Sequence, residues 1–558
     1  MHDIQNIITE RVDDIPLLLE QMQRMGLPAL LDDHCPIHGN WQGLSLGWVS
    51  TIWLSSMLSR GDHRLVHVEP WVAQRLWTLG ATTGQAIKRV DCTDDRLESV
   101  LRRVSDDTRW AACASALHQH TVRVYALSTA RVHVDSPSAS AYATVTEGGL
   151  FQLGHSKDDR PDLPQVKVMQ AVLDPLGMPL ATDVVSGERA DDPLYVPCIE
   201  RVQTSVGRRG LLYVGDCKMA ARETRAFIAA PGDFYLCPLP QVQLAEGEFA
   251  AALEAVWSGE RTRIPVLRER PDGTSALLAE GSEYRVPMSQ AVGGGVQNWT
   301  ERRLMVRSVR QAHAAEVALR ARVAQAMAQI EALNQRGRGK KRVEDVSAFR
   351  QAVVAIVQRY GVEAFVWFRL THHATPRPVR TYRGRPARIA EDRHATVAVC
   401  MDEVALEAAV RRWGWRVYGT NQPGESLSLA QAVLAYRSAY LVERSLGRLK
   451  GRPRSLTPRY GQRDDHATGR MRLLSIAWRV LTLLECVGRR PLAATGTKLA
   501  GLYAGNPRRE TARPTAEHLL EAFRDLTLTI MEGPQQTDRH VTALSPLQQR
   551  ILGILGFP

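Results

Sequence analysis

Residues 132–237 carry the feature that most restricts the fold, a series of strand-length apolar runs with helical stretches only in its second half. The predicted order is strand, strand, strand, helix, strand, helix, strand, over residues 132–135, 166–173, 180–185, 191–206, 211–216, 220–230 and 233–237. Strands joined by turns pair antiparallel, whereas strands joined by a helix return in parallel. We therefore predict an α/β fold with a mixed sheet, in which the first and fourth strands lie side by side at the centre.

The chain is too long for a single hydrophobic core. At 558 residues it is expected to divide into about three or four domains. We predict a helical N-terminal domain, a mixed-sheet core in two parts, an insertion domain that is β-rich and then helical, and a C-terminal tail. Their boundaries are residues 1–125 for the N-terminal domain, 126–240 and 406–490 for the core, 241–405 for the insertion and 491–558 for the tail.

Basic residues outnumber acidic ones, 71 Lys and Arg against 59 Asp and Glu, which gives a formal net charge of +12. Such a balance favours a nucleic-acid partner, because Lys and Arg displace counterions from phosphates; a generally basic protein from an arginine-rich proteome is the alternative. The eight cysteines include no Cys-x-x-Cys pair, which favours a reducing compartment over a zinc ribbon. No long apolar run or secretory leader is found, so we expect a cytoplasmic protein with no membrane partner.

Two aspartates end predicted strands of the core. Asp135 ends the first strand and Asp216 ends the fourth. If these strands are neighbours and parallel, both carboxylates emerge at one edge of the sheet. An aspartate after an apolar strand is also commonly the first polar residue of a loop or a helix cap, so each aspartate alone indicates little.

A tyrosine, a glutamate and a lysine recur every seven residues at Tyr436, Glu443 and Lys450. Seven residues return an α-helix to within about 20° of the same face, and Ser428 with Gln431 forms a capping-box pattern that starts such a helix. We predict one helix that carries all three side chains and brings Glu443 to the two aspartates. Three clustered carboxylates require cations, and their oxygens select Mg²⁺ or Mn²⁺, two ions about 3.5–4 Å apart in phosphoryl transfer. An ordinary salt-bridged helix is the alternative.

These residues resemble an insertion-sequence transposase of the Asp-Asp-Glu class, in the IS-four-like group that has a ribonuclease H-like core and a large insertion before the glutamate. The signature of that group is Tyr, two residues, Arg, three residues, Glu, six residues, Lys. Tyr436, Glu443 and Lys450 match it, whereas Ala439 occupies the Arg position and Arg437 lies beside the tyrosine. Residues 153–165 and 449–456 also resemble characteristic segments of one subgroup.

The resemblance implies that Asp135, Asp216 and Glu443 bind two Mg²⁺ ions and catalyse DNA cleavage and strand transfer. It implies that the side chains around this site hold DNA; the candidates are Tyr436, Arg437, Lys450 and Arg452, and Trp299, for which packing in the interior is the alternative. The N-terminal helices would read terminal inverted repeats, and the protein would act on double-stranded DNA as a homo-oligomer. The rival interpretations are a metal-dependent nuclease without strand transfer and a catalytically silent DNA-binding remnant, which Ala439 keeps open.

Overall fold

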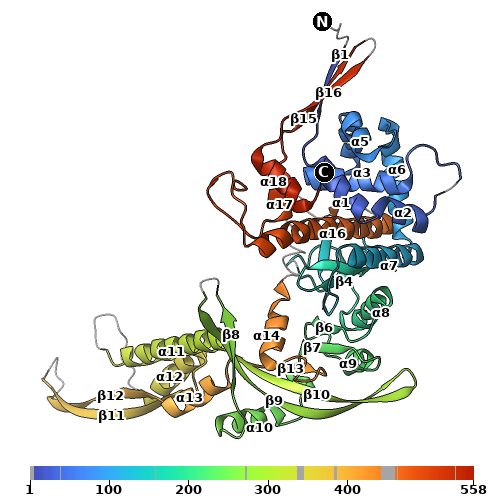
Figure 1. Cartoon of the computed structure of the whole chain (residues 1–558). Helices are drawn as coiled ribbons and strands as arrows, with labels where there is room; N and C mark the ends of the chain where they lie inside the picture. The colour runs from blue at the N-terminus through green and yellow to red at the C-terminus, as the bar shows by residue number, and fades with distance from the viewer. Residues whose placement is uncertain are drawn as a thin grey trace.

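The computed structural model describes residues 6–557 apart from residues 38, 158, 271–272, 336–344, 382–385, 441–458, 461–462 and 534–535. The molecule is elongated (Figure 1), with helices from both ends of the chain gathered at one end and a sheet in the middle. The segment around α11 (Val309–Ala332) and α12 (Val346–Tyr360) forms the other end. Within the described residues, no helix is both long and apolar enough to cross a membrane.

The middle of the sheet has the strand order that the sequence predicts. The order is β5–β4–β2–β6–β7, with bounds β2 (Arg131–Asp135), β4 (Gln165–Leu173), β5 (Met178–Ser186), β6 (Leu212–Gly215) and β7 (Phe234–Pro238). β4 pairs antiparallel with β2 and β5, whereas β6 is parallel to both β2 and β7. The crossovers are α8 (Tyr195–Val206) and α9 (Arg222–Ala229). The predicted meander and its two parallel additions are confirmed.

The strands at the centre of this sheet are buried, including the polar side chains of His133 on β2 and Lys167 on β4. All nine residues of β4 are buried, as are all four residues of β6. A short strand that the sequence did not indicate, β3 (Ser138–Tyr142), follows β2 and pairs with the first residues of β4. β14 (Arg459–Tyr460) adds to β3 in parallel. The rigid centre of the fold is therefore β4, β2 and β6, next to which the strand-end aspartates lie.

The sheet does not stop at β7 but continues into the predicted insertion. The outer strands follow in the order β13–β10–β9–β8, with bounds β13 (Trp415–Thr420), β10 (Gly295–Ser308), β9 (Ser275–Val292) and β8 (Ile264–Glu269). β10 pairs antiparallel with β13, from Arg302 opposite Thr420 to Arg307 opposite Trp415. Gly293 and Gly294 form the β9–β10 turn with positive φ angles, which glycine adopts without strain. The first part of the insertion is rich in strands, as predicted, and β9 and β10 are 18 and 14 residues long.

Beyond the sheet, a second hydrophobic core forms from helices α11 and α12, helix α13 (Glu403–Arg412) and a hairpin of β11 (Val366–Val379) and β12 (Arg388–Met401). Its buried side chains include Leu319 and Val323 of α11 and Phe349 and Val353 of α12. Helix α11 belongs to the helical second part predicted for the insertion. The β11–β12 hairpin was not predicted.

The N-terminal segment is helical, as predicted, and packs on a long C-terminal helix. Its helices are α1 (Ile15–Arg24), α2 (Leu27–His34), α3 (Leu46–Arg60), α4 (Val68–Ala73), α5 (Leu76–Thr83), α6 (Asp94–Ser105) and α7 (Asp107–Val124). Helix α16 (Asp464–Thr495) contacts α6 on one side and β5 on the other, and thereby joins these helices to the sheet. It is buried over most of its length, Trp478 included.

The last residues are folded, although the sequence indicated a tail at 491–558. They form α17 (Ala516–Glu521), β15 (Thr527–Glu532), β16 (Thr537–Val541) and α18 (Pro546–Leu555). β15 pairs with β1 (Asn6–Arg11), so the two ends of the chain share a sheet. Helix α18 packs on α16. This pairing joins residues more than 500 positions apart, so no local sequence pattern predicts it.

The helix predicted to start at the Ser428 capping box is shorter than expected. The box is present, and α14 runs from Leu429 to Arg437. Ser438 then caps the helix and Ala439 lies in a turn, so the prediction of one continuous helix from Tyr436 to Lys450 is wrong at residues 438–439. At this helix end the Ser438 hydroxyl bonds to the carbonyl of Ala435 within α14 and also contacts residues of β2 and the β4–β5 turn.

Candidate active site

Asp135 and Asp216 lie at adjacent positions on neighbouring parallel strands. Val134 of β2 is in register with Gly215 of β6. The residue that follows each of these two in the sequence is one of the two aspartates. Neighbouring strands lie about 4.8 Å apart, and side chains in register point to the same face. Both residues are half-buried. The sequence-based expectation that the ends of the first and fourth strands meet at one edge is thus met by the backbone register.

A tyrosine that the sequence analysis missed holds Asp216. The hydroxyl of Tyr195, at the start of α8, donates a hydrogen bond of 2.6 Å to Oδ1 of Asp216. The backbone N–H of Lys218 donates to the same oxygen at 2.9 Å. Burial, followed by the charges of Asp216, Asp135 and Asp191, raises the pKa of Tyr195 well above its usual value. The phenol therefore stays protonated and acts as a donor at neutral pH.

A partly buried ionic cluster supports the chain directly after Asp135. Lys167 of β4 donates to Oδ1 of Asp191 at 2.8 Å, and Lys157 lies 3.3 Å from Oδ2 of the same carboxylate. Lys157 also donates to the backbone carbonyl of Ser136. Burial alone would raise the pKa of Asp191, but the two ammonium groups outweigh it and lower the pKa. Lys157 belongs to the 153–165 loop that the sequence singled out, and its position was not predicted.

Helix α14 covers the face of the sheet on which the aspartates lie. Leu429 and Val433 of α14 share a hydrophobic cluster with Leu212 and Val214 of β6 and with Leu236 of β7. Because side chains alternate along a strand, Asp216 continues the face that Leu212 and Val214 begin. The strand end with the two carboxylates is therefore bordered by α14.

Tyr436 of α14 lies within electrostatic range of Asp216. Its ring meets the ring of Tyr418 edge-on, with centroids 4.8 Å apart. Burial, then Tyr418 and the carboxylate of Asp216, raise the pKa of Tyr436. Like Tyr195, this phenol is a hydrogen-bond donor at neutral pH. The predicted role of Tyr436 in DNA binding stays a prediction.

The end of α14 is fixed to β2 by buried polar contacts. Oγ of Ser438 lies 3.0 Å from Nε2 of His133 and 3.2 Å from Oδ2 of Asp174. Arg131 donates to the same Asp174 oxygen at 2.7 Å. Burial would raise the pKa of Asp174, but the hydrogen bonds and charges of His133 and Arg131 lower it overall. His133 precedes Asp135 by two residues, so α14 is anchored to the strand that carries the first carboxylate.

The remaining predicted site residues are placed as follows. Glu443, Lys450 and Arg452 lie outside the described residues. Arg437 is exposed at the end of α14. The indole N–H of Trp299, which is half-buried on β10, donates to the hydroxyl of Tyr235 at 2.9 Å. That hydroxyl bonds in turn to the buried Glu301 at 2.6 Å, so Trp299 belongs to a polar network between β7 and β10.

The donor set fits a hard cation in part. Asp135 and Asp216 offer carboxylate oxygens, which Mg²⁺ and Mn²⁺ prefer. The Tyr195 and Lys218 hydrogen bonds both fall on Oδ1 of Asp216, which leaves Oδ2 for a metal. In the part of the chain that the structure describes, no group of three His, Cys, Asp or Glu residues is placed to hold a metal. A third ligand from Glu443 stays a prediction.

Comparison with known proteins does not assign this chain to a family. No family model matches the chain, and no curated protein matches it. Solved structures with detectable similarity include a cryo-EM structure of the piggyBac transposase synaptic complex with hairpin DNA. That protein is 8% identical, with 83% of this chain and 81% of that chain covered at a TM-score of 0.25. Such a likeness does not define a shared fold, so the site is interpreted from its own residues.

Proposed function

We propose that this chain is a DNA transposase with a ribonuclease H-like core, which cleaves DNA at terminal inverted repeats and transfers the strand ends. The observation that carries the proposal is the register of Val134 with Gly215 on the parallel strands β2 and β6, after which Asp135 and Asp216 follow directly. The order β5–β4–β2–β6–β7, three antiparallel strands followed by two parallel ones, supports the ribonuclease H-like assignment. The Tyr436, Glu443 and Lys450 spacing supports the transposase class.

In this proposal the protein residues prepare a phosphodiester site. Asp135, Asp216 and Glu443 would hold Mg²⁺, which when bound activates the attacking oxygen and stabilises the leaving one. Tyr195 fixes the orientation of the Asp216 carboxylate through its 2.6 Å hydrogen bond. Tyr436, whose raised pKa keeps it protonated, can donate to a phosphate oxygen. The net charge of +12 attracts DNA, and two transposon ends would require a homo-oligomer.

The proposal is tested with a plasmid that carries the inverted repeats bracketing the gene. We expect Mg²⁺-dependent cleavage and joining by the wild-type chain. Asp135→Asn and Asp216→Asn should each lower cleavage by at least about 1000-fold, by analogy with the loss of other essential catalytic groups, while DNA binding is retained. Asp192→Asn is the matched control, because Asp192 is exposed and makes only a 3.8 Å contact with Lys218.

The same assay separates the rival functions. Cleavage that never leads to joining would identify a metal-dependent nuclease. Binding of the repeats without any cleavage by the wild-type chain, in Mg²⁺ or Mn²⁺, would identify a silent remnant and overturn the proposal. Full activity of Asp216→Asn would show that the strand-end carboxylates are not the catalytic groups.

A further inference from the structure

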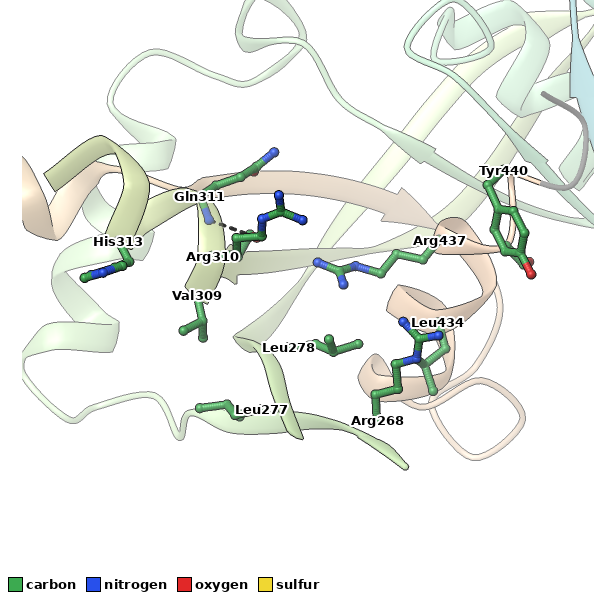
Figure 2. A pocket seen from close by; sticks show the side chains of 12 residues that line it. Arg268, Leu277, Leu278, Val309, Arg310, Gln311, His313, Leu434, Arg437 and Tyr440 are labelled. Carbon is green, nitrogen blue, oxygen red and sulfur yellow. Dashed lines mark hydrogen bonds between the residues drawn. The ribbon is translucent and has the colours of Figure 1, made fainter. Parts of the chain in front are cut away.

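A large cleft opens between the end of α14, the start of α11 and strands β8 and β9. Its volume is about 1010 Å³. Figure 2 shows its side chains, with Arg437 reaching from the end of α14 toward the first residues of α11. Arg310 lines the cleft from α11 and Arg268 lines it from β8. All three arginines are exposed.

The arginines of this cleft lack paired carboxylates in the part of the chain that the structure describes. Within the described residues, Arg268, Arg310 and Arg437 have no ion-pair partner, and no carboxylate lines the cleft. Neighbouring arginines differ, since Arg307 lies 3.2 Å from Glu280 and Arg263 lies 3.8 Å from it. Three like charges around one cleft repel each other unless an anion lies between them, so the arrangement favours a ligand with several negative charges.

The cleft also carries exposed apolar side chains. Leu277, Val309 and Leu434 line it and are all exposed. Exposed apolar groups grouped among cations suit a ligand with both charged and carbon-rich parts. A sugar–phosphate backbone has this character, because its phosphates bind arginine while the sugars contact apolar side chains. An isolated inorganic anion would use the arginines alone.

The cleft is continuous with the anchored end of α14. Ser438 lines the cleft, and its hydroxyl lies 3.0 Å from Nε2 of His133. His133 precedes Asp135 by two residues on β2. A chain of direct contacts therefore links the cleft to the strand that carries the first candidate metal ligand.

We infer that this cleft holds the sugar–phosphate backbone of a DNA strand that leads to or from the Asp135–Asp216 site. The inference rests on the proposed function for its choice of DNA, and on the cleft for its location. Arg268 and Arg310, contributed by β8 and α11, each bind a backbone phosphate. The segment inserted between the two parts of the core thereby becomes part of the DNA-binding surface.

The test is the salt dependence of DNA binding in EDTA, where no cleavage occurs. A fluorescent 30-base-pair duplex and a 12-nucleotide single strand are each titrated with the full-length chain between 50 and 300 mM KCl, design values of about the range over which phosphate contacts are lost. The slope of log K against log salt is negative. We expect the Arg268→Gln/Arg310→Gln double variant to reduce its magnitude by about 1.8 for duplex, or by about 1.4 if the cleft takes an unpaired strand.

A matched control variant is Arg263→Gln/Arg320→Gln. Both arginines already pair with carboxylates, Arg263 with Glu280 and Arg320 with Glu316 and Glu403. The control should keep the wild-type slope within about 0.3, because paired arginines displace few DNA counterions. An Arg268→Lys/Arg310→Lys variant keeps the charge and should restore most of the slope, which separates phosphate binding from misfolding.

Wild-type slopes for the Arg268→Gln/Arg310→Gln variant with both DNAs would overturn the inference. An equal reduction of the slope in the matched control would also overturn it. So would binding of pyrophosphate at the cleft while the salt slope for DNA binding stays unchanged. These outcomes are independent of the proposed function. If the cleft inference is wrong and the proposed function is right, the protein still cleaves DNA in Mg²⁺ but the double variant keeps the wild-type slope. If the cleft inference is right and the proposed function is wrong, the double variant shows the reduced slope although the protein never cleaves DNA.

Discussion

The hydroxyl of Tyr195 donates a 2.6 Å hydrogen bond to Oδ1 of Asp216, the carboxylate at the end of β6. The tyrosine is almost completely buried at the start of α8, the crossover helix that precedes β6. The fold thus supplies the candidate metal ligand together with the group that orients it. A buried phenol beside a carboxylate fixes one oxygen and leaves the other available, which is how outer groups tune metal ligands.

If the chain is the Mg²⁺-dependent transposase proposed above, replacing this hydroxyl should weaken its use of Mg²⁺ without unfolding the protein. Tyr195→Phe keeps the ring but removes the donor, so the Mg²⁺ concentration that gives half-maximal DNA cleavage should rise by about 10-fold or more. The thermal midpoint should change little. Tyr213→Phe is the control, since Tyr213 is buried on β6 and its hydroxyl has no hydrogen-bond partner within the described residues. Equal Mg²⁺ requirements in Tyr195→Phe and wild type would contradict a positioning role.

Glu301 of β10 joins the inserted strands to the core through buried charges. Its carboxylate pairs with Arg225 of α9 and accepts a bond from Nε of Arg303 at 3.1 Å. Glu301→Gln leaves buried guanidinium charge uncompensated and should lower stability by about 3–5 kcal/mol, measured by urea unfolding. Glu254→Gln, at an exposed position of α10 (Glu248–Trp257), should have no comparable effect. An unchanged urea midpoint in Glu301→Gln would mean that other groups compensate the buried guanidinium charges.

His118 of α7 should make the fold acid-sensitive. Burial, followed by the charge of Arg479, lowers its pKa from 6.5 to about 3. Between these values the unfolded chain binds a proton that the folded chain does not, so stability falls as pH falls, by about 1.4 kcal/mol per pH unit. His118→Gln should remove this contribution, which unfolding at several pH values between 4 and 7 measures. The same change at the exposed His540 should leave the dependence of stability on pH unchanged. If His118→Gln also leaves this dependence unchanged, groups other than His118 cause the acid sensitivity.

The core could be predicted from sequence because its information is local. β6 and β7 are short apolar runs, and β2 and β4 are rich in valine, with polar residues between the apolar ones. The connections between these strands decide parallel or antiparallel pairing. The adjacency of Asp135 and Asp216 follows from that order alone. Tyr195 lay on a predicted helix, but a tyrosine on an apolar helix face is normally a packing residue, so nothing in the sequence marked its hydroxyl.

The missed features depend on contacts between distant residues. β11 alternates only at its start, where Val366, Phe368 and Leu370 pack in the core formed with α11 and α12, and most of its later residues are exposed. β1 and β15 pair across almost the whole chain. The interval from Tyr436 to Lys450 has good helical periodicity, yet α14 ends at Arg437, where Ser438 contacts both Ala435 of the same helix and His133, 305 positions away.

That contact gives the last prediction. Ser438→Ala removes the hydroxyl that His133 and the Asp174 carboxylate share at 3.0 and 3.2 Å, which should lower stability by about 1–3 kcal/mol, because buried polar groups lose a partner. We also expect DNA cleavage to fall by about 10-fold, since the loosened end of α14 carries Tyr436 and precedes Glu443. Ser426→Ala, in an exposed turn before α14, is the control. In a double-mutant cycle, Ser438→Ala and His133→Gln should be coupled by 0.5 kcal/mol or more, about the lower limit for residues in contact. Strictly additive effects on unfolding and cleavage would show that α14 is held to β2 without this hydrogen bond.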